Sequence, residues 1–536
     1  MAMNEWGSRA VRRVILIIVL LAITSLAAFL RLPRLRAVPG WYPDEGSNIA
    51  IAASLAQGEQ AYLAFGHSSF INGHPPLVYL EMALLFRWLG VDILWARLLT
   101  VGLGLLTLLL LYIVADRMCG QQVALLASAF YAFYPSAVVY NRLALTYNQL
   151  APLYLLVPYG LWQAVEDGRR RWVALAALCT GAALLADLAA ASLLGFLALA
   201  LLFVRPRALL WALPLALLPL LIWGGAMWLS AGEFFLQDVV FTFSRTTASL
   251  PVQVARVVFY RTALEGDLWL ALGGLGLLFQ TDHRQRWLTA GLFGFSLFVF
   301  VRNSPVFGQA SYFLIPLFPL VALGVGVLLA RGIPVLVSLL EAAWRAGLER
   351  FRLSPRGRAR LTTLLTGLIL FLLLLAPPIS MIAEGLWLDY GLYLVRFGDT
   401  LADPAAADQT AAYVNARTTP DDVVLCSPAI AWLLHAHAAD FQMAIAATGQ
   451  ATQHFPAGIP PSRFRFDPRL ENATYVILDP FWRGWASAQM PEVAEMVREV
   501  EEGWGMERRF GEFEVYRCPS GGEGRGGWSG ALGGGG

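Results

Sequence analysis

The hydrophobic residues of this chain fall into long, nearly uninterrupted blocks, separated by short polar connections. A helix needs roughly 17–25 apolar residues to cross a bilayer. The pattern therefore predicts a polytopic α-helical membrane protein with about eleven spans, the shorter of which pack inside a bundle. The spans are expected at residues 13–30, 92–115, 121–140, 150–166, 172–186, 188–204, 208–229, 267–280, 286–301, 311–330 and 361–381.

The composition supports a membrane protein. Of the 536 residues, 57% are hydrophobic and 14% are charged, and the mean hydropathy is +0.59. A soluble domain is about 45–50% apolar and about 25% charged. The shortage of polar residues excludes an ordinary cytosolic enzyme, a disordered protein and a nucleic-acid-binding protein. All 39 basic residues are arginine, so any contact that lysine usually makes must fall to arginine.

Arginine in the short connections predicts the orientation, because cytoplasmic loops of membrane proteins are enriched in basic residues. With an odd number of spans, the arginine-rich connections all fall on the side of the N-terminus. This arrangement predicts a multi-pass protein of the plasma (inner) membrane, with a cytoplasmic N-terminus and an extracytoplasmic C-terminus. The arginines that carry the argument are Arg9, Arg12, Arg13, Arg117, Arg169–Arg171, Arg205, Arg207, Arg284, Arg286 and those from Arg331 to Arg360.

The apolar segment Pro75–Gly90 is an exception to the span count. Counting it as a span would reverse the orientation of everything that follows and place Arg169–Arg171 outside. Glu81 and Arg87 within it suit a helix that lies at the membrane surface better than one that faces lipid tails. We therefore predict an interfacial helix in the outer leaflet.

The composition changes near residue 384, where charged residues and turn signals return. We predict three regions: a transmembrane module at 1–383 with an outer loop at 31–91, an extracytoplasmic soluble α/β domain at 384–519, and a Gly-rich disordered tail at 520–536. In the domain we expect strands at 423–425, 475–478 and 510–518, and helices at 409–417, 429–438 and 491–502. Cys426 and Cys518 fall in predicted strands and are compatible with a disulfide or with two free thiols.

Candidate chemistry lies on the outer side, where Asp44-Glu45 follows the first span. Adjacent carboxylates near a bilayer are costly to place. One of them can act as a general base while the other holds an arginine or a metal. A structural alternative is equally open: Asp44 can cap a helix over Glu45–Gln57.

Outer arginines form a second group of candidates, because the planar guanidinium suits the phosphates that lipids present at this depth. Anchoring to lipid headgroups is the structural alternative for each of them. The arginines on this side are Arg31, Arg34, Arg36, Arg142, Arg245, Arg256, Arg261 and Arg302.

Five motifs in order resemble the family 39-type GT-C glycosyltransferases, whose relatives include protein O-mannosyltransferases and lipid A aminoarabinose transferases. The resemblance covers roughly residues 10–330. The motifs are Asp44-Glu45, His74-Pro75-Pro76-Leu77, Ala96-Arg97-Leu98, Arg142-Leu143-Ala144-Leu145-Thr146 and the stretch Tyr312–Pro319.

The resemblance implies a GT-C-like membrane fold with a C-terminal exported α/β domain. It implies transfer of a hexose or pentose from a polyprenyl-phosphate donor to a lipid, glycan or protein acceptor on the outer face. The implied catalytic residues are Asp44, as the base or the residue that orients the acceptor, and Glu45 beside it. Inversion at the anomeric carbon is expected, because the outer loops show no second obvious nucleophile. No cofactor or metal ligand is assigned, and a divalent metal stays open. The resemblance also implies that basic residues of the outer loops bind the carrier phosphate. Arg142 is the first candidate, because it stands in a matched motif, and the further candidates are His74, Arg245, Arg256 and Arg261.

The chain departs from the family pattern at two places. Tyr147-Asn148 stands where relatives often have an acid, and Asp187 stands where many have a lysine. We expect Asp187 to mark an outer turn between two spans. The departures indicate either a different substrate or a non-catalytic relative. A polytopic lipid or glycan transporter with an exported binding domain is a separate alternative. Transporters tend to show internal repeats and acidic residues at mid-membrane positions, and the sequence shows neither, which argues against this alternative.

Overall fold

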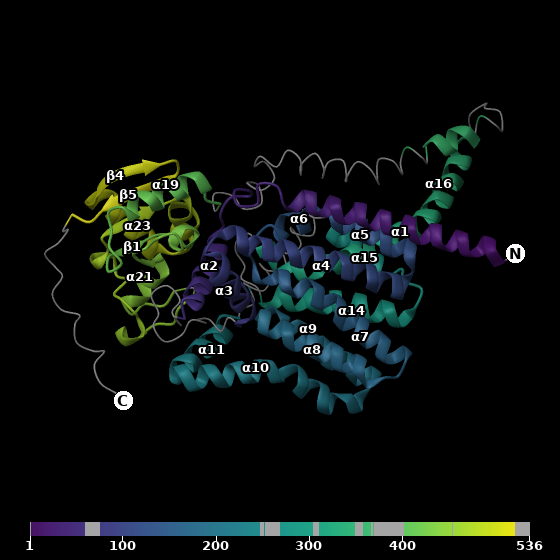
Figure 1. Ribbon diagram of the computed structural model, residues 1–536, viewed down its shortest axis with the longest axis horizontal. Helices are drawn as coiled ribbons and strands as arrows, with labels where there is room; N and C mark the ends of the chain where they lie inside the picture. Colours follow the sequence, from purple (N-terminus) through teal and green to yellow (C-terminus); the bar gives the residue numbers. More distant parts are fainter. Residues whose placement is uncertain are drawn as a thin grey trace.

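The computed structural model places a bundle of apolar helices beside a smaller C-terminal unit built on a β-sheet (Figure 1). The structure describes residues 2–58, 75–246, 251, 268–303, 310–348, 357, 359–365, 368, 401–452 and 454–519.

The bundle confirms the apolar helices expected from the sequence, since each of the first ten predicted spans coincides with one helix or with two or three consecutive helices. The eleventh, at 361–381, lies mostly outside the described residues. The bundle helices are α1 (Ala2–Arg31), α4 (Ile93–Cys119), α5 (Gln121–Phe133), α6 (Pro135–Asn141), α7 (Leu150–Glu166), α8 (Arg170–Ala186), α9 (Ala191–Val204), α10 (Leu209–Ala231), α13 (Leu268–Leu277), α14 (His283–Asn303), α15 (Phe318–Val327) and α16 (Ile333–Leu348).

Several of these helices can cross a membrane on length and apolarity alone. Within the described residues four do so, and a fifth is added if α5 and α6, bent by 58°, form one broken span. The other bundle helices are shorter or less apolar, and α16 projects away from the bundle (Figure 1). A multi-pass membrane protein follows from this finding, while the count of eleven stays a prediction.

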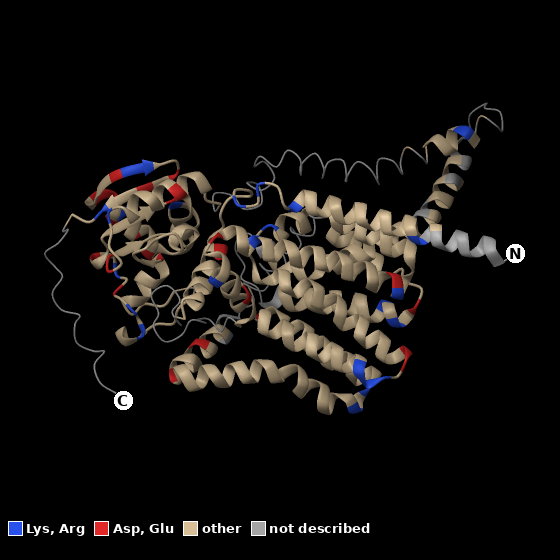
Figure 2. Ribbon diagram, viewed as in Figure 1, with Lys and Arg blue, Asp and Glu red and all other residues tan. Residues whose placement is uncertain are grey.

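Charged residues gather at the ends of the bundle and are almost missing from its middle (Figure 2). At the end that also holds the N-terminus, Arg284 at the start of α14 pairs with Glu166 at the end of α7, with 3.3 Å between Nη1 and Oε1. Arg331 donates to the carbonyl of Phe279 there, at 3.3 Å. The arginine-rich connections thus lie opposite the C-terminal unit.

Helix α15 is the centre of the bundle, and each of its residues is buried. It meets α13 through glycines: a Cβ on Gly324 would lie 1.8 Å from the Gly273 carbonyl oxygen, and one on Gly276 would lie 2.1 Å from that of Gly324. The backbones therefore touch. In a membrane such contact is a main source of helix association, because lipid tails remove the hydrophobic driving force.

Helices α2 (Pro43–Ala56) and α3 (Leu77–Leu89) lie at the end of the bundle that faces the C-terminal unit (Figure 1). One face of α3 is buried, whereas Leu80, Leu84 and Trp88 on the other face are 51%, 61% and 79% exposed. Arg87 is exposed beside them. An apolar exposed face with tryptophan and arginine is typical of a helix at a membrane surface, which supports the predicted interfacial location.

The C-terminal unit contains a five-stranded sheet in the order β2-β1-β3-β5-β4. Strands β1, β2 and β3 run parallel, and β5 runs antiparallel to both β3 and β4. Its elements are α19 (Pro404–Asn415), β1 (Val423–Leu425), α20 (Pro428–Ala431), β2 (His437–Ala439), α21 (Phe441–Ala447), β3 (Tyr475–Leu478), α22 (Ser487–Gln489), α23 (Pro491–Gly503), β4 (Gly505–Phe510) and β5 (Phe513–Arg517).

One local prediction in this unit was wrong, and another was incomplete. The helix expected at 429–438 ends at Ala431, and residues 437–439 form strand β2 against β1. An alanine-rich run has high helix propensity, but strand pairing overrides it. The strand expected at 510–518 is present as β5, but its antiparallel partner β4 was not predicted. The two strands form a hairpin whose turn contains Gly511 with φ +55°.

The cysteines of the chain are free thiols, including Cys426 and Cys518. Cys426 is buried at the end of β1, and burial raises the pKa of its thiol well above the usual range. Of the two alternatives open from the sequence, the structure has the free thiols.

The glycine contact between α13 and α15 predicts a steric effect on stability. Gly324→Ala places a methyl group against the Gly273 carbonyl, and overpacking of this kind costs about 1–3 kcal/mol. Gly294→Ala in α14 is the matched control, because nothing lies within 4 Å of its added Cβ. Unfolding of the detergent-solubilised protein measures both. Equal stability of the two variants would contradict the packing assigned to α15.

Candidate active site

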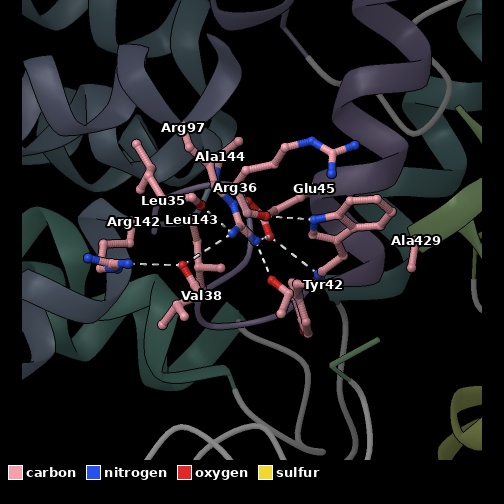
Figure 3. A network of polar contacts seen from close by, with 12 residues as sticks. Leu35, Arg36, Val38, Tyr42, Glu45, Arg97, Arg142, Leu143, Ala144 and Ala429 are labelled. Carbon is pink, nitrogen blue, oxygen red and sulfur yellow. Dashed lines mark hydrogen bonds and ion pairs between the residues drawn. The ribbon is translucent and has the colours of Figure 1, made fainter. Parts of the chain in front are cut away.

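A fully buried ion pair joins the first outer loop to α4. Glu45 and Arg97 both have side chains 0% exposed, with 2.7 Å between Oε2 and Nη2. A second contact of 2.9 Å joins Nε to Oε1, so the pair is bidentate (Figure 3). Removing either partner of such a pair leaves an uncompensated charge in the interior. The pair therefore fixes the start of α2 against the membrane bundle.

Arg97 also organises the backbone of the outer loop. Its Nη1 donates to the carbonyls of Leu35 at 2.9 Å and Val38 at 3.3 Å, and its Nη2 donates to the carbonyl of Gly40. Carbonyls that have no regular secondary structure are thereby satisfied inside the protein. This explains why an arginine stands in an apolar block, within the Ala96-Arg97-Leu98 motif.

Glu45 uses both of its carboxylate oxygens for structure. Oε2 accepts from the backbone N–H of Tyr42 at 3.3 Å, and Oε1 accepts from that of Ala144 at 2.7 Å. Asn48, one turn further along α2, donates to the carbonyl of Ala144 at 3.0 Å. The motif that begins at Arg142 is thereby attached to α2, and Glu45 acts as a positioning residue.

The start of α2 differs from the capping alternative. The helix begins at Pro43, with Tyr42 as the flanking residue, and the carboxylate that accepts the N-terminal N–H belongs to Glu45. Asp44 therefore does not cap α2. Its carboxylate is left for other contacts, which is the arrangement a catalytic carboxylate requires.

Asp44 lies among tyrosines, half-buried, and its carboxylate accepts a hydrogen bond from the hydroxyl of Tyr312. The ring of Tyr312 lies 6.5 Å from that of Tyr42 and 5.2 Å from that of Tyr147, measured between centroids. Burial raises the pKa of Asp44 to about 6, the Tyr312 hydrogen bond opposes the rise, and the charge of Glu45 adds to it. A carboxylate with this pKa suits proton transfer near neutral pH.

Asp187 brings a second carboxylate to the same tyrosines. It occupies the turn between α8 and α9, as expected, and accepts from Thr146 Oγ1 and from the N–H of Ala189, both at 2.8 Å. Its charge acts on the hydroxyls of both Tyr147 and Tyr312. Asp187 thus holds the Arg142–Thr146 motif in place on the side of the bundle.

Arg142 is 1% exposed and lies against the outer loop. Its Nη1 donates to the carbonyls of Leu30 at 3.2 Å and Arg31 at 3.1 Å, and its Nη2 to those of Pro33 at 2.7 Å and Val38 at 3.2 Å. Figure 3 shows Arg142 and Arg97 donating to Val38 from opposite sides. These contacts favour a positioning role, and a phosphate contact through Arg142 stays a prediction.

The other predicted phosphate ligands are not placed by the structure. His74, Arg256 and Arg261 lie outside the described residues. Arg245 is in the last turns of α11 (Glu233–Thr246), and its side chain also lies outside them. Their role therefore stays a prediction.

The described residues do not offer a ligand set for a metal. Among them, no group of three or more His, Cys, Asp or Glu side chains could hold a metal ion. Glu45 is committed to Arg97 and to backbone N–H groups, so Asp44-Glu45 does not form a site with two available carboxylates.

Arg97 and Tyr312 belong to the site, but neither was assigned a role from the sequence. Arg97 had a usable signal, because an arginine inside an apolar block must have a partner. Tyr312 had none, since a tyrosine at the start of a span is also an ordinary interface anchor. Its contact with Asp44 arises only where η5 (Ala310–Leu317) meets α2.

Comparison with known proteins gives one family match. Residues 73–228 match the model of the family described as dolichyl-phosphate-mannose-protein mannosyltransferase. No curated protein sequence matches the chain.

Solved structures resemble the whole chain. The crystal structure of ArnT from Cupriavidus metallidurans bound to undecaprenyl phosphate is 18% identical, with 94% of this chain and 97% of that chain covered and a TM-score of 0.61. The archaeal oligosaccharyltransferase AglB from Archaeoglobus fulgidus, in complex with an inhibitory peptide and a dolichol-phosphate, is 12% identical, with 96% and 75% covered and a TM-score of 0.56. Together with the family match, these likenesses confirm the resemblance to the GT-C superfamily of membrane glycosyltransferases.

The buried ion pair predicts a large effect on stability. Arg97→Met leaves the Glu45 carboxylate buried and unpaired, which costs about 3–5 kcal/mol. Arg36→Met is the matched control: Arg36 also pairs with carboxylates of the outer loop and the C-terminal unit, but it is 38% exposed, and such pairs contribute about 0–1 kcal/mol. Unfolding in detergent distinguishes them. Equal midpoints for the two variants would count against the central role of Arg97.

Proposed function

We propose that the protein transfers one sugar from a polyprenyl-phosphate-linked donor to a lipid, glycan or protein acceptor on the outer face of the membrane. The observation that carries the proposal is Asp44, a half-buried carboxylate that is not used to cap its helix and contacts Tyr312. The likeness to a structure bound to undecaprenyl phosphate, and to one bound to a dolichol-phosphate and an inhibitory peptide, supports a polyprenyl phosphate as the carrier of the donor sugar.

In the proposed reaction, Asp44 removes the proton from the acceptor hydroxyl while that oxygen attacks the anomeric carbon of the donor. The new glycosidic bond forms as the bond between the anomeric carbon and the phosphate oxygen breaks, and the electron pair leaves with the phosphate. A single displacement inverts the anomeric configuration. Tyr312 orients the Asp44 carboxylate through its hydroxyl, and Glu45 with Arg97 holds the turn that carries Asp44.

The leaving lipid phosphate requires positive charge, which guanidinium groups supply in a fork geometry suited to phosphate. We assign the binding of this phosphate to basic residues of two connections on the predicted outer side, at residues 31–91 and 231–266. Arg245, Arg256, Arg261 and His74 are the first candidates, because the described contacts of Arg142 hold the outer loop.

For the arrangement in the cell, we propose a transmembrane module at 1–383, an extracytoplasmic α/β domain at 384–519 and a Gly-rich tail at 520–536, in the plasma (inner) membrane. The arginine-rich connections at the end of the bundle that holds the N-terminus support a cytoplasmic N-terminus. The C-terminal unit at the opposite end is then extracytoplasmic, next to Asp44.

The central test is Asp44→Asn, which removes the basic lone pair and keeps the size of the side chain. If Asp44 is the base, turnover falls by about 10²–10⁴-fold with folding intact. Asp92→Asn is the matched control, because Asp92 caps α4 on the same side and asparagine caps about as well as aspartate. The measurement is release of undecaprenyl phosphate from a panel of undecaprenyl-phosphate-linked sugars by protein in liposomes, with lipid, glycan and peptide acceptors supplied in turn. Full turnover by Asp44→Asn would refute the assignment.

The pKa of Asp44, raised by burial to about 6, predicts the acid limb of the pH profile. Below that pH the base is protonated, so turnover falls by about tenfold per pH unit. The pKa of Asp44 is about 6 in the folded protein and 3.8 for an ordinary aspartate, so the folded protein binds the proton more tightly than the unfolded chain. Protonation of Asp44 therefore raises the free energy of unfolding as the pH falls from about 6 to 3.8. The loss of turnover is therefore not unfolding driven by Asp44. A profile that stays flat down to pH 4.5 would contradict the assignment.

A further inference from the structure

The C-terminal unit touches the turn that carries Asp44. Gly46 follows Asp44-Glu45 in α2, and a Cβ added to it would lie 1.8 Å from the carbonyl oxygen of Pro428 and 2.9 Å from the Cα of Ala429. Pro428 begins α20, directly after the first strand of the sheet. The two backbones are therefore in contact, and a side chain at Gly46 would force them apart. Figure 3 shows Ala429 of the C-terminal unit beside the polar contacts of Glu45 and Arg97.

Trp41 strengthens the same contact. It is 0% exposed, and its ring centroid lies 5.2 Å from that of Trp432 in the C-terminal unit. Its backbone exchanges two hydrogen bonds with Ala402, each of 2.9 Å. The residues immediately before Asp44 are thus held by backbone pairing and by aromatic packing at once.

A second attachment lies at α11, far from the first in sequence. Arg463 and Asp238 form a bidentate ion pair, with 3.0 Å between Nη1 and Oδ1 and 2.9 Å between Nη2 and Oδ2. Their side chains are 0% and 2% exposed. The guanidinium also lies over the ring of Phe234, 4.9 Å from its centroid. A buried pair between two units resists separation, because either charge left alone in the interior is costly.

We infer that the C-terminal unit is a positioning element for Asp44. The contact of Gly46 with Pro428 sets the place of the first turn of α2 relative to Tyr312, and the pair of Arg463 with Asp238 keeps the unit in position. From the bundle side, the same turn is held through Glu45. The inference rests on the proposed function, because it concerns the position of Asp44 as the reacting carboxylate. Asp44 makes no capping contact in α2, so the turn that carries it must be held by other contacts.

The first experiment uses Gly46→Ala in the full chain, reconstituted in lipid nanodiscs. The added methyl displaces the turn, and a misplacement of about 1 Å can lower turnover by about 10²-fold. Binding of undecaprenyl phosphate should stay within about threefold of wild type, because the change acts on the base. Gly102→Ala in α4 is the control, since nothing lies within 4 Å of its Cβ. It should keep wild-type turnover.

The second experiment removes the attachment at α11, the pair of Arg463 with Asp238, and leaves no buried charge without a partner. The double variant Arg463→Met with Asp238→Leu replaces the buried pair with apolar side chains, which proteins often tolerate. Hydrogen exchange at the amides of Trp41 and Ala402 reports the contact directly, because each amide donates to the other residue. Both amides should exchange faster than in wild type, and turnover should fall without loss of undecaprenyl phosphate binding.

The outcomes separate the inference from the proposed function. Wild-type turnover in Gly46→Ala and in the double variant, with Asp44→Asn inactive, overturns the inference alone. Unchanged exchange at Trp41 and Ala402 in both variants overturns it as well, whatever the turnover. Full activity of Asp44→Asn overturns the proposed function, and the exchange data then still decide whether the C-terminal unit holds the turn.

Discussion

The ion pair of Glu45 with Arg97 is the interaction on which the end of the bundle next to the C-terminal unit depends. Both side chains are fully buried, and each continues into hydrogen bonds with backbone groups of a loop that has little regular structure. A charge in such a place is stable only with its partner, so the two residues enforce one arrangement of the loop, α2 and α4. The motif beginning at Arg142 joins the same arrangement through the N–H of Ala144.

The adjacent carboxylates of Asp44 and Glu45 have different contacts in this arrangement. Glu45 takes the structural contacts, including the one at the helix N-terminus, and Asp44 is left to face Tyr312. Two neighbouring acids thereby have different environments: Glu45 is committed to an ion pair and to backbone N–H groups, whereas Asp44 faces a tyrosine hydroxyl. The direction of the Asp44 shift follows from burial, and its size is limited by the hydroxyl of Tyr312.

Arginine carries much of this architecture, which suits a chain without lysine. Arg97 and Arg142 each donate to several carbonyls, and Arg463 forms a fork with Asp238. A guanidinium has five donors in a fixed plane and stays charged when buried, so it can bind several acceptors at once. The outer arginines that suggest phosphate binding from the sequence thus include some whose described contacts are with the protein itself.

The sequence by itself determined the apolar helices, the α/β character of residues 401–519 and the likeness to the GT-C superfamily. These follow from local composition, helix length and ordered motifs, which need no knowledge of distant contacts. Only the tertiary structure decided which acid of Asp44-Glu45 binds Arg97, that Arg142 contacts loop carbonyls, and that residues 437–439 pair as a strand. Each depends on groups far apart in the chain, where burial and partner geometry outweigh local propensity.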